Sequence, residues 1–260
     1  MVAAGFALAA TVVFGATPQE EAFMRVWRVH AADPTKHDAV IEACNRATGV
    51  GEFLPVVRTL AAWHLLASGR QQDAILNFES ALTTDRTASA IARNADTMAR
   101  RWLTRIDHIA VERALKAHYT TNVEFPGSLQ SILSLPNPPP RTDRFGTAWV
   151  YKAEQMKISK ARNQKFSLHS QTLGSRLTAM QSLPFTSYGK RQAAIVARRQ
   201  GSPVMLEFET VTEAGTQRGT ASEGSAVNGI RFLKLASDGQ FAVMIENESD
   251  FWVVATTRSR

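Results

Sequence analysis

The histidines are the side chains in this sequence best suited to metal binding or proton transfer, and they are scattered along it. His30 and His37 form the pair nearest to a site, because they flank the carboxylate of Asp33. Histidines that bind one metal ion from a helix usually stand four positions apart, whereas these two stand on either side of an Asp-Pro turn. We therefore predict that they belong to a surface turn and that the chain holds no metal.

Nucleophilic catalysis is also predicted to be absent. The single cysteine, Cys44, stands in a helix-like stretch with Val40, Ile41 and Ala43, and no histidine partner is placed beside it. It is predicted to be a small core residue. The sequence contains no Gly-x-Ser-x-Gly elbow, no Gly-x-Gly-x-x-Gly loop and no Walker-type phosphate loop. We expect neither an enzyme nor a cofactor.

Length and composition predict a globular chain of two or three compact units. The chain has 260 residues, of which 44% are hydrophobic, so it can bury sizeable cores. The formal net charge of +7 comes from dispersed Lys and Arg, without interleaved aromatics or a nucleic-acid motif. We expect no nucleic-acid partner.

Residues 2–16 form an uncharged apolar run that ends before Thr17-Pro18. This run is shorter than the roughly twenty residues of a membrane span and fits the apolar region of a signal peptide, although a buried N-terminal helix stays open. We expect an exported protein of the periplasm or cell envelope that is peripheral to the membrane at most.

Residues 17–86 predict helical hairpins. Within residues 53–86, small and aromatic residues recur at the spacing of a tetratricopeptide repeat, which this stretch resembles. The matching residues are Ala62, Leu65, Gly69, Ala74, Phe78 and Ala81. A plain helical bundle is the alternative. If the stretch forms a peptide-binding groove, that groove must expose Trp63 or His64 together with Asn77.

Residues 87–118 contain no Gly or Pro and predict one long amphipathic helix that ends near Tyr119. One apolar stripe is expected to be buried, and the part with Trp102, Ile106 and Ile109 is expected to lie under the β-hairpin that follows the helix. The stripe holds Met98, Trp102, Ile106, Ile109, Ala110, Ala114 and Ala117. The rest of the helix surface carries Arg93, Arg100, Arg101, Arg105 and Arg113.

Two motifs follow this helix. In the first, Phe125-Pro126 is expected to plug the base of the helix, and a short second helix follows whose apolar side holds Leu129, Ile132 and Leu133. In the second, Asp143 closes a tight turn with Phe145 and Gly146, and Trp149 and Tyr151 then project from one face of a strand onto the helix.

Together these motifs resemble the globular part of the major pseudopilin of type II secretion, over residues of about 98–174. The resemblance implies a pilin-like fold, from about residue 87 to 174, and protein partners in a secretion or pilus-like system. Two departures matter. Ala10 stands where the family has Glu, and the apolar run stops at Ala16 instead of extending over the roughly twenty residues of the family's apolar helix, so we expect a monomer or small closed oligomer rather than a filament. No Asp follows Ser170 to supply a calcium ligand, so no metal is expected here either.

The remaining chain predicts a linker with a short helix over residues 175–202 and a small antiparallel β domain over residues 203–260. A helix-like run extends from Lys190 to Arg199, and alternation of apolar and polar residues begins after Pro203. Asp238-Gly239 is typical of a hairpin turn.

The sequence therefore predicts an α+β fold and a non-catalytic, exported envelope protein that acts through protein-protein contacts in a type II secretion or type IV pilus-like system. The alternative is a soluble adaptor that binds peptides through its tetratricopeptide-like hairpins.

Overall fold

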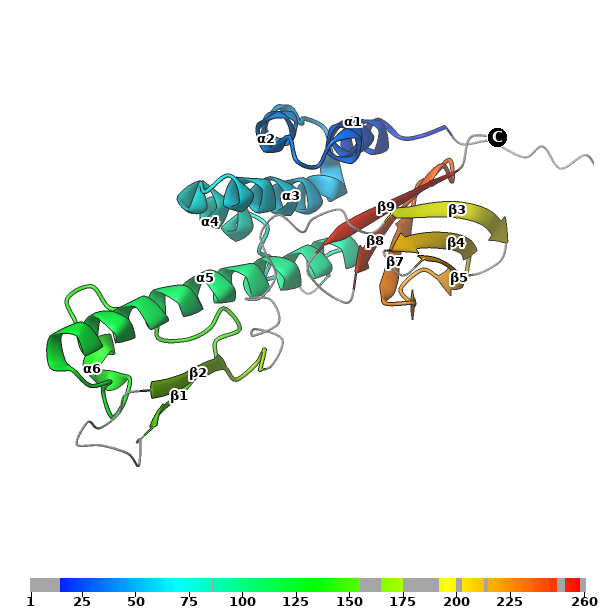
Figure 1. The fold of residues 1–260 in the computed structure, drawn as a ribbon. Helices are drawn as coiled ribbons and strands as arrows, with labels where there is room; N and C mark the ends of the chain where they lie inside the picture. The colour runs from blue at the N-terminus through cyan, green and yellow to red at the C-terminus, as the bar shows by residue number, and fades with distance from the viewer. Residues whose placement is uncertain are drawn as a thin grey trace, which may run out of the picture.

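The computed structural model describes residues 15–85, 87–154, 165–174, 192–199, 203–212, 215–246 and 251–257. The fold is α+β, with most helices in the first half of the chain and most strands in the second, as the sequence predicts (Figure 1). The helices are α1 (Pro18–Ala32), α2 (His37–Arg46), the 3-10 helix η1 (Gly51–Phe53), α3 (Leu54–Ala67), α4 (Gln71–Glu79), α5 (Ala90–Asn122) and α6 (Gln130–Leu133). The strands are β1 (Trp149–Glu154), β2 (Lys165–Ser170), β3 (Gln192–Arg199), β4 (Met205–Thr212), β5 (Gly215–Ser222), β6 (Ala226–Val227), β7 (Ile230–Leu235), β8 (Phe241–Glu246) and β9 (Trp252–Thr257).

The 33-residue helix α5 runs through the molecule and joins three packed parts (Figure 1). The helical module consists of α1 to α4 with the first half of α5, and the β module consists of β3 to β9. The hairpin module consists of the second half of α5, α6, β1 and β2. Buried side chains of the first half of α5 belong to the core of the helical module, whereas Val111 and Leu115 belong to the core of the hairpin module.

The helical and β modules share one core, although the sequence predicts separate units for residues 17–86 and 203–260. Thr17 caps α1 in a capping box with Glu20, which fixes where the helix begins. Phe23 of α1 stacks on Phe53 at 4.7 Å between ring centroids and approaches Phe241 of β8 at 6.0 Å. The aromatic contacts therefore bind the N-terminal helices to the C-terminal strands.

The β module is a seven-stranded mixed sheet in the order β5-β4-β3-β9-β8-β7-β6. Strand β8 is buried on both faces, because alternate side chains enter different cores: Phe241, Val243 and Ile245 face the helices, and Ala242 and Met244 face the inside of the sheet. The sheet is nearly closed on itself.

Its two edge strands meet at a close contact between β5 and the turn after β6. The side-chain amide of Asn228 donates a hydrogen bond to the carbonyl of Arg218 at 3.1 Å. A Cβ added at Gly219 would lie 2.9 Å from Val227, so this position requires glycine. The sheet can curl shut here because β5 carries no side chain at the contact.

Two predictions for this region are wrong. Within the predicted linker with a short helix over residues 175–202, residues 192–199 form strand β3; residues 175–191 and 200–202 lie outside the described residues. Strand β3 pairs antiparallel with β4 and parallel with β9, so sheet hydrogen bonding overrides the helix-like composition. The β domain is accordingly larger than the small antiparallel sheet expected, and it is mixed.

The predicted surface of α5 is also corrected. Arg101 and Arg105 are buried rather than exposed, and the Arg105 guanidinium carbon lies 5.2 Å from the centre of the Trp102 ring. Trp102 and Ile106 belong to the core shared by the helical and β modules, and the hairpin of β1 and β2 does not cover them. The middle of α5 is therefore enclosed all round, which a single-stripe pattern does not predict.

Helix α5 ends at Asn122, three residues beyond the predicted end, and Val123 caps it in the left-handed region with a φ of 61°. A β-branched side chain is strained there, since its Cβ crowds the following carbonyl. Val123 is 69% exposed, so its side chain gains little from packing.

We expect Val123→Gly to stabilise the protein by about 0.5–1 kcal/mol, measured by chemical denaturation, because glycine relieves the left-handed strain at a helix C-cap. Val123→Ala keeps the Cβ and should give no such gain. Loss of stability in Val123→Gly would show that the strain at this position is negligible.

Candidate functional site

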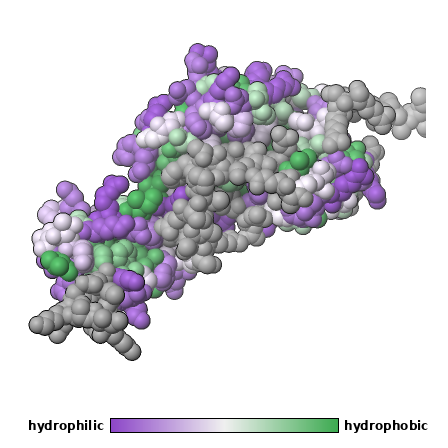
Figure 2. Space-filling view, viewed as in Figure 1, coloured by the Kyte–Doolittle hydropathy of each residue, from purple (hydrophilic) through white to green (hydrophobic). Residues whose placement is uncertain are grey.

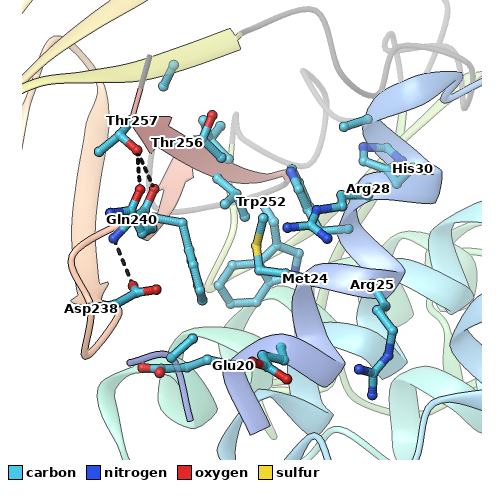
Figure 3. A pocket seen from close by; sticks show the side chains of 18 of the residues that line it. Glu20, Met24, Arg25, Arg28, His30, Asp238, Gln240, Trp252, Thr256 and Thr257 are labelled. Atoms are coloured by element: carbon cyan, nitrogen blue, oxygen red, sulfur yellow. Dashed lines mark hydrogen bonds between the residues drawn. The ribbon is translucent and has the colours of Figure 1, made fainter. Parts of the chain in front are cut away.

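A cavity of about 920 Å³ lies between α1 and the strands β8 and β9 (Figure 3). Its apolar side is formed by Met24 and Trp27 of α1, Phe241 of β8, and Trp252 and Val254 of β9. Amphipathic positions of α1 build this wall, because the helix turns one apolar stripe toward the sheet and keeps Glu21, Arg25 and Arg28 exposed.

Glu20 lies at one end of the cavity, and both of its carboxylate oxygens accept hydrogen bonds. Its Oε1 accepts hydrogen bonds from the backbone N–H of Ser237 at 2.8 Å and from the Ser237 hydroxyl at 2.9 Å, and its Oε2 accepts the N–H of Thr17 at 2.7 Å. Burial alone would raise the pKa of Glu20, but these hydrogen bonds outweigh it and hold the pKa below its usual value. The carboxylate therefore ties α1 to the β7–β8 turn and is unsuited to act as a general acid.

The outer rim of the cavity is polar. Arg25 and Arg28 project from α1 and are exposed. On the opposite side, the Thr257 hydroxyl donates to Oε1 of Gln240 at 2.7 Å, and Trp252 on the floor donates its indole N–H to the Thr59 hydroxyl at 2.8 Å. The cavity thus has charged and hydrogen-bonding groups above an aromatic floor.

A row of hydrogen-bonded imidazoles begins at the other end of the cavity, where His30 forms part of the wall (Figure 3). His30 Nδ1 lies 3.0 Å from His64 Nε2, and His64 Nδ1 lies 3.0 Å from His37 Nδ1. The three rings come from α1, α3 and α2, and His30 and His64 are buried while His37 is half-buried. We call these three residues the histidine row.

Burial keeps the two inner histidines neutral. It lowers the pKa of His30 to about 4, and burial together with the charges of His30 and His37 lowers the pKa of His64 to about 3. The row is not arranged as a metal site, because His64 uses its two nitrogens in opposite directions and the three rings do not converge. Among the residues that the structure describes, no group of three or more His, Cys, Asp or Glu side chains could hold a metal ion.

The prediction of a surface turn at His30 and His37 is wrong. His30 is 3% exposed, and the two residues are joined through His64. No local sequence signal could find this row, because His64 is supplied by a different helix. Cys44 is a buried core residue as predicted, and burial raises the pKa of its thiol to about 12, which makes it a poor nucleophile.

The residues proposed for a peptide-binding groove do not form one. Helices α3 and α4 form the predicted helical hairpin, but Trp63 and His64 are 2% and 0% exposed. The half-buried Asn77 donates its side-chain amide to the carbonyl of Asp73 at 2.9 Å on its own helix. The adaptor hypothesis therefore loses the residues it requires, because Trp63 and His64 are buried against α1 and α2.

The predicted motif of the hairpin module is assembled as expected. Phe125 is buried between Tyr119, stacked at 4.7 Å, and Phe166, edge-on at 4.7 Å. The Tyr151 hydroxyl donates to the carbonyl of Pro126 at 2.6 Å. Leu129 and the buried Ile132 pack at the same core. Phe125-Pro126 thus closes the base of α5, with the short helix α6 beside it.

The second half of that motif is a closed turn. Asp143 is 2% exposed and accepts hydrogen bonds from the N–H groups of Phe145 and Thr147 and from the hydroxyls of Thr147 and Ser170. Gly146 takes a φ of 86°, as predicted for this position. Trp149 follows on β1.

Trp149 fixes the hairpin against α5. It is buried, donates its indole N–H to the carbonyl of Pro140 at 2.9 Å, and lies edge-on to His108 of α5 at 5.7 Å. His108 in turn contacts β2, where its Nε2 lies 2.9 Å from the carbonyl of Leu168. The strand, the loop before it and the long helix are therefore held together at one point.

Arg144 joins the hairpin module to the helical module, and the sequence does not indicate it. Its guanidinium donates to Asp107 of α5, with Nε 2.5 Å from Oδ2, and to Glu79 of α4, with Nη1 3.0 Å from Oε1. The carbonyl of Arg144 accepts a hydrogen bond from Arg100 at 2.8 Å. These contacts lock the turn between Asp143 and Gly146 to two helices.

No protein-family model, curated protein or solved structure matches this chain.

Proposed function

We propose that this chain is a non-catalytic protein of the cell envelope that acts through protein-protein contacts, as a component or accessory of a type II secretion or type IV pilus-like system. The observation that carries the proposal is the hairpin module. The motifs that resemble the major pseudopilin, in the same order along the chain, pack as one unit: helix, Phe-Pro plug, short helix, Asp-containing turn and antiparallel hairpin.

An accessory role is favoured over a filament subunit. In the resembled family, the N-terminal part of the long helix is apolar and is shared between neighbouring subunits. Here the first half of α5 is covered by α3, α4 and β7 of the same chain, so little apolar helix surface remains for a neighbour. This packing agrees with a monomer or a small closed oligomer.

A non-catalytic role is supported by the state of the titratable groups at the cavity. Glu20 is saturated with hydrogen bonds and the buried His30 is held neutral, so neither is poised near neutral pH as a general acid or base.

Export is proposed from the apolar residues 2–16, of which residues 2–14 lie outside the described residues. None of the helices that the structure describes combines the length and the apolar character needed to cross a membrane.

The hairpin module offers exposed apolar side chains to a partner (Figure 2). Val150 on β1 and Val211 on β4 are both 42% exposed, which makes them a matched pair on different modules. Val150→Glu adds a charge to the outer face of the hairpin, and Val211→Glu adds the same charge to the β module. Both changes are at the surface and should leave the fold intact.

The test is affinity capture of the full chain from envelope extracts of its native cell, with captured proteins identified by mass spectrometry. We expect capture of pilin-like or secretion-system proteins by the unchanged chain and by Val211→Glu, and at least tenfold less by Val150→Glu. Absence of such proteins from the captured set would contradict the proposed system. Equal capture by both variants would contradict the use of the hairpin.

A further inference from the structure

The histidine row connects three helices through two hydrogen bonds in series, and each hydrogen bond contains one proton. A neutral imidazole has one N–H donor and one acceptor nitrogen, so the central His64 must donate to one neighbour and accept from the other. Two neutral arrangements satisfy both hydrogen bonds, and they differ only in the direction in which all the protons point.

Added protons strain the histidine row. The first extra proton leaves both hydrogen bonds in place: an imidazolium at His30 or His37 donates to His64, which donates onward, and an imidazolium at His64 donates to both neighbours but puts the charge on a side chain with no exposed surface. A second proton on any of the three rings places two N–H donors opposite each other across 3.0 Å. The row therefore keeps both hydrogen bonds with up to one added proton and loses one of them with two.

Two uncharged indole rings of the described residues face the row. Trp27 of α1 lies 4.9 Å from His30, and Trp63 of α3 lies 5.0 Å from His64 and 5.9 Å from His37. Burial, and then the charges of His30 and His37, lower the pKa of His64.

The charged side chains nearby along α1, α2 and the loop that connects them either bind other groups or lie at the surface. The carboxylate of Asp33 accepts from the N–H of Thr35 at 3.0 Å and the Thr35 hydroxyl at 2.6 Å, and lies 3.8 Å from Lys36. Arg28 lies on the outer rim of the cavity, and Asp38 is exposed at the start of α2.

The part of the fold that depends on the row includes α2, which buries few side chains of its own. Helix α2 buries only Val40, Ile41 and Cys44, whereas α1 is held at its centre by Phe23 and at its start by Glu20. His37 joins α2 to α3, and His30 joins the last turn of α1 to α3. We call the last turn of α1, α2 and their connection the corner.

We propose that the histidine row is a pH-sensitive latch, which holds the corner against α3 while its rings are neutral and releases it on acidification. Because His30, Ala31 and Pro34 form one end of the cavity, release of the corner also opens that end.

The direction of the pH effect follows from the lowered pKa values. In the released corner His30 and His64 return to an ordinary pKa of about 6.5, so the latched form takes up fewer protons below that pH. Its stability is complete above about pH 6.5 and falls as the pH drops toward the folded pKa of about 4 for His30. For that histidine alone, the opening equilibrium at pH 5 should rise by roughly 30-fold, and coupling to His64 should increase it further.

The test is amide hydrogen exchange of the full chain at pH 7.5 and pH 5.0, with exchange times corrected for the intrinsic effect of pH. We expect protection of peptides within residues 28–46 to fall at least 30-fold at pH 5.0, while peptides of β8 and the second half of α5 change less than threefold. A corner whose protection is the same at both pH values would overturn the proposal, and so would an equal loss of protection throughout the described fold.

Variants separate the latch from general acid sensitivity. His64→Gln removes one of the two buried titrating rings, and its acid-induced loss should shrink at least tenfold; His30→Gln, at the other buried ring, gives the same test if His64→Gln folds poorly. His169→Gln, on the exposed side of β2, is the matched control and should behave as the unchanged chain. An undiminished acid response in both row variants would overturn the proposal.

Discussion

Trp102→Ala is expected to lower the free energy of unfolding by about 3–5 kcal/mol and to loosen the helical and β modules together. The Trp102 side chain is 1% exposed and stacks nearly parallel to Phe78 of α4, with 6.3 Å between ring centroids. It also contacts Phe251, which precedes β9, at 6.4 Å. Truncation leaves a cavity where three elements meet, a large loss against a typical stability of about 5–15 kcal/mol.

The measurement is thermal or chemical denaturation together with hydrogen exchange of β8 and the hairpin. We substitute alanine for Trp102 rather than aspartate, because a carboxylate at position 102 could form an ion pair with the nearby Arg105 guanidinium and so offset part of the lost packing. Leu76→Ala, at a side chain 62% exposed on α4, is the control and should cost less than about 0.5 kcal/mol. If Trp102→Ala loosened only the hairpin module, the shared core would be the wrong description.

The hairpin module could be predicted in detail because its determinants are local. The segment from Phe125 to Tyr151 contains the Phe-Pro pair that closes the base of α5, the turn at Asp143 and the start of β1. These parts depend on residue types that few others can replace, namely proline, a buried aspartate and a glycine in the left-handed region. The aromatic contacts then follow from the strand's alternation, since Trp149 and Tyr151 project from one face.

The rest of the fold depends on contacts between residues that lie far apart in the sequence. Ala193, Ala194 and Ile195 would suit a helix, but they become β3 because β4 and β9 complete the sheet on either side. The sharing of one core by α1 and β8 likewise rests on Phe23 and Phe241, more than two hundred positions apart, and no periodicity predicts that pairing.

The histidine row and the Arg144 contacts illustrate the same limit for polar residues. His64 stands in an apolar helix and Arg144 in a turn, where sequence alone favours a core residue and a surface charge. Each is bound by side chains from helices distant in the sequence: His64 by residues of α1 and α2, and Arg144 by residues of α4 and α5. Burial and hydrogen bonding decide these sites, and both are properties of the folded chain.

Asp143→Ala is expected to destabilise the hairpin module by about 3 kcal/mol, because it leaves buried donors without an acceptor. The donors are the N–H groups of Phe145 and Thr147 and the hydroxyls of Thr147 and Ser170, at 2.6–3.0 Å from the carboxylate. Asp143→Asn should cost less, since one acceptor oxygen is kept and the two hydroxyls can rotate. Hydrogen exchange of β1 and β2 measures the loss, and protection of β8 should be retained.

The pH dependence gives an independent check on Asp143. Burial would raise its pKa, but the hydrogen bonds from Ser170, Thr147 and Phe145 outweigh it and hold the pKa below its ordinary value. Its contribution is therefore complete at neutral pH and is lost as the pH falls below about 4 toward the lower folded value, so the hairpin module should weaken there in the unchanged chain and less steeply in Asp143→Ala.

Asp85 provides the matched control for Asp143, because its carboxylate also accepts the backbone N–H two residues on, without the burial. Its carboxylate accepts from the N–H of Thr87 at 2.8 Å and from the Thr87 hydroxyl at 2.7 Å, but it lies on an exposed loop between α4 and α5. Water can replace both hydrogen bonds in Asp85→Ala, so that variant should change stability far less than Asp143→Ala. Equal effects of the two substitutions would mean that the local turn, and not the buried link from Asp143 to Ser170 of β2, accounts for the stability of the module.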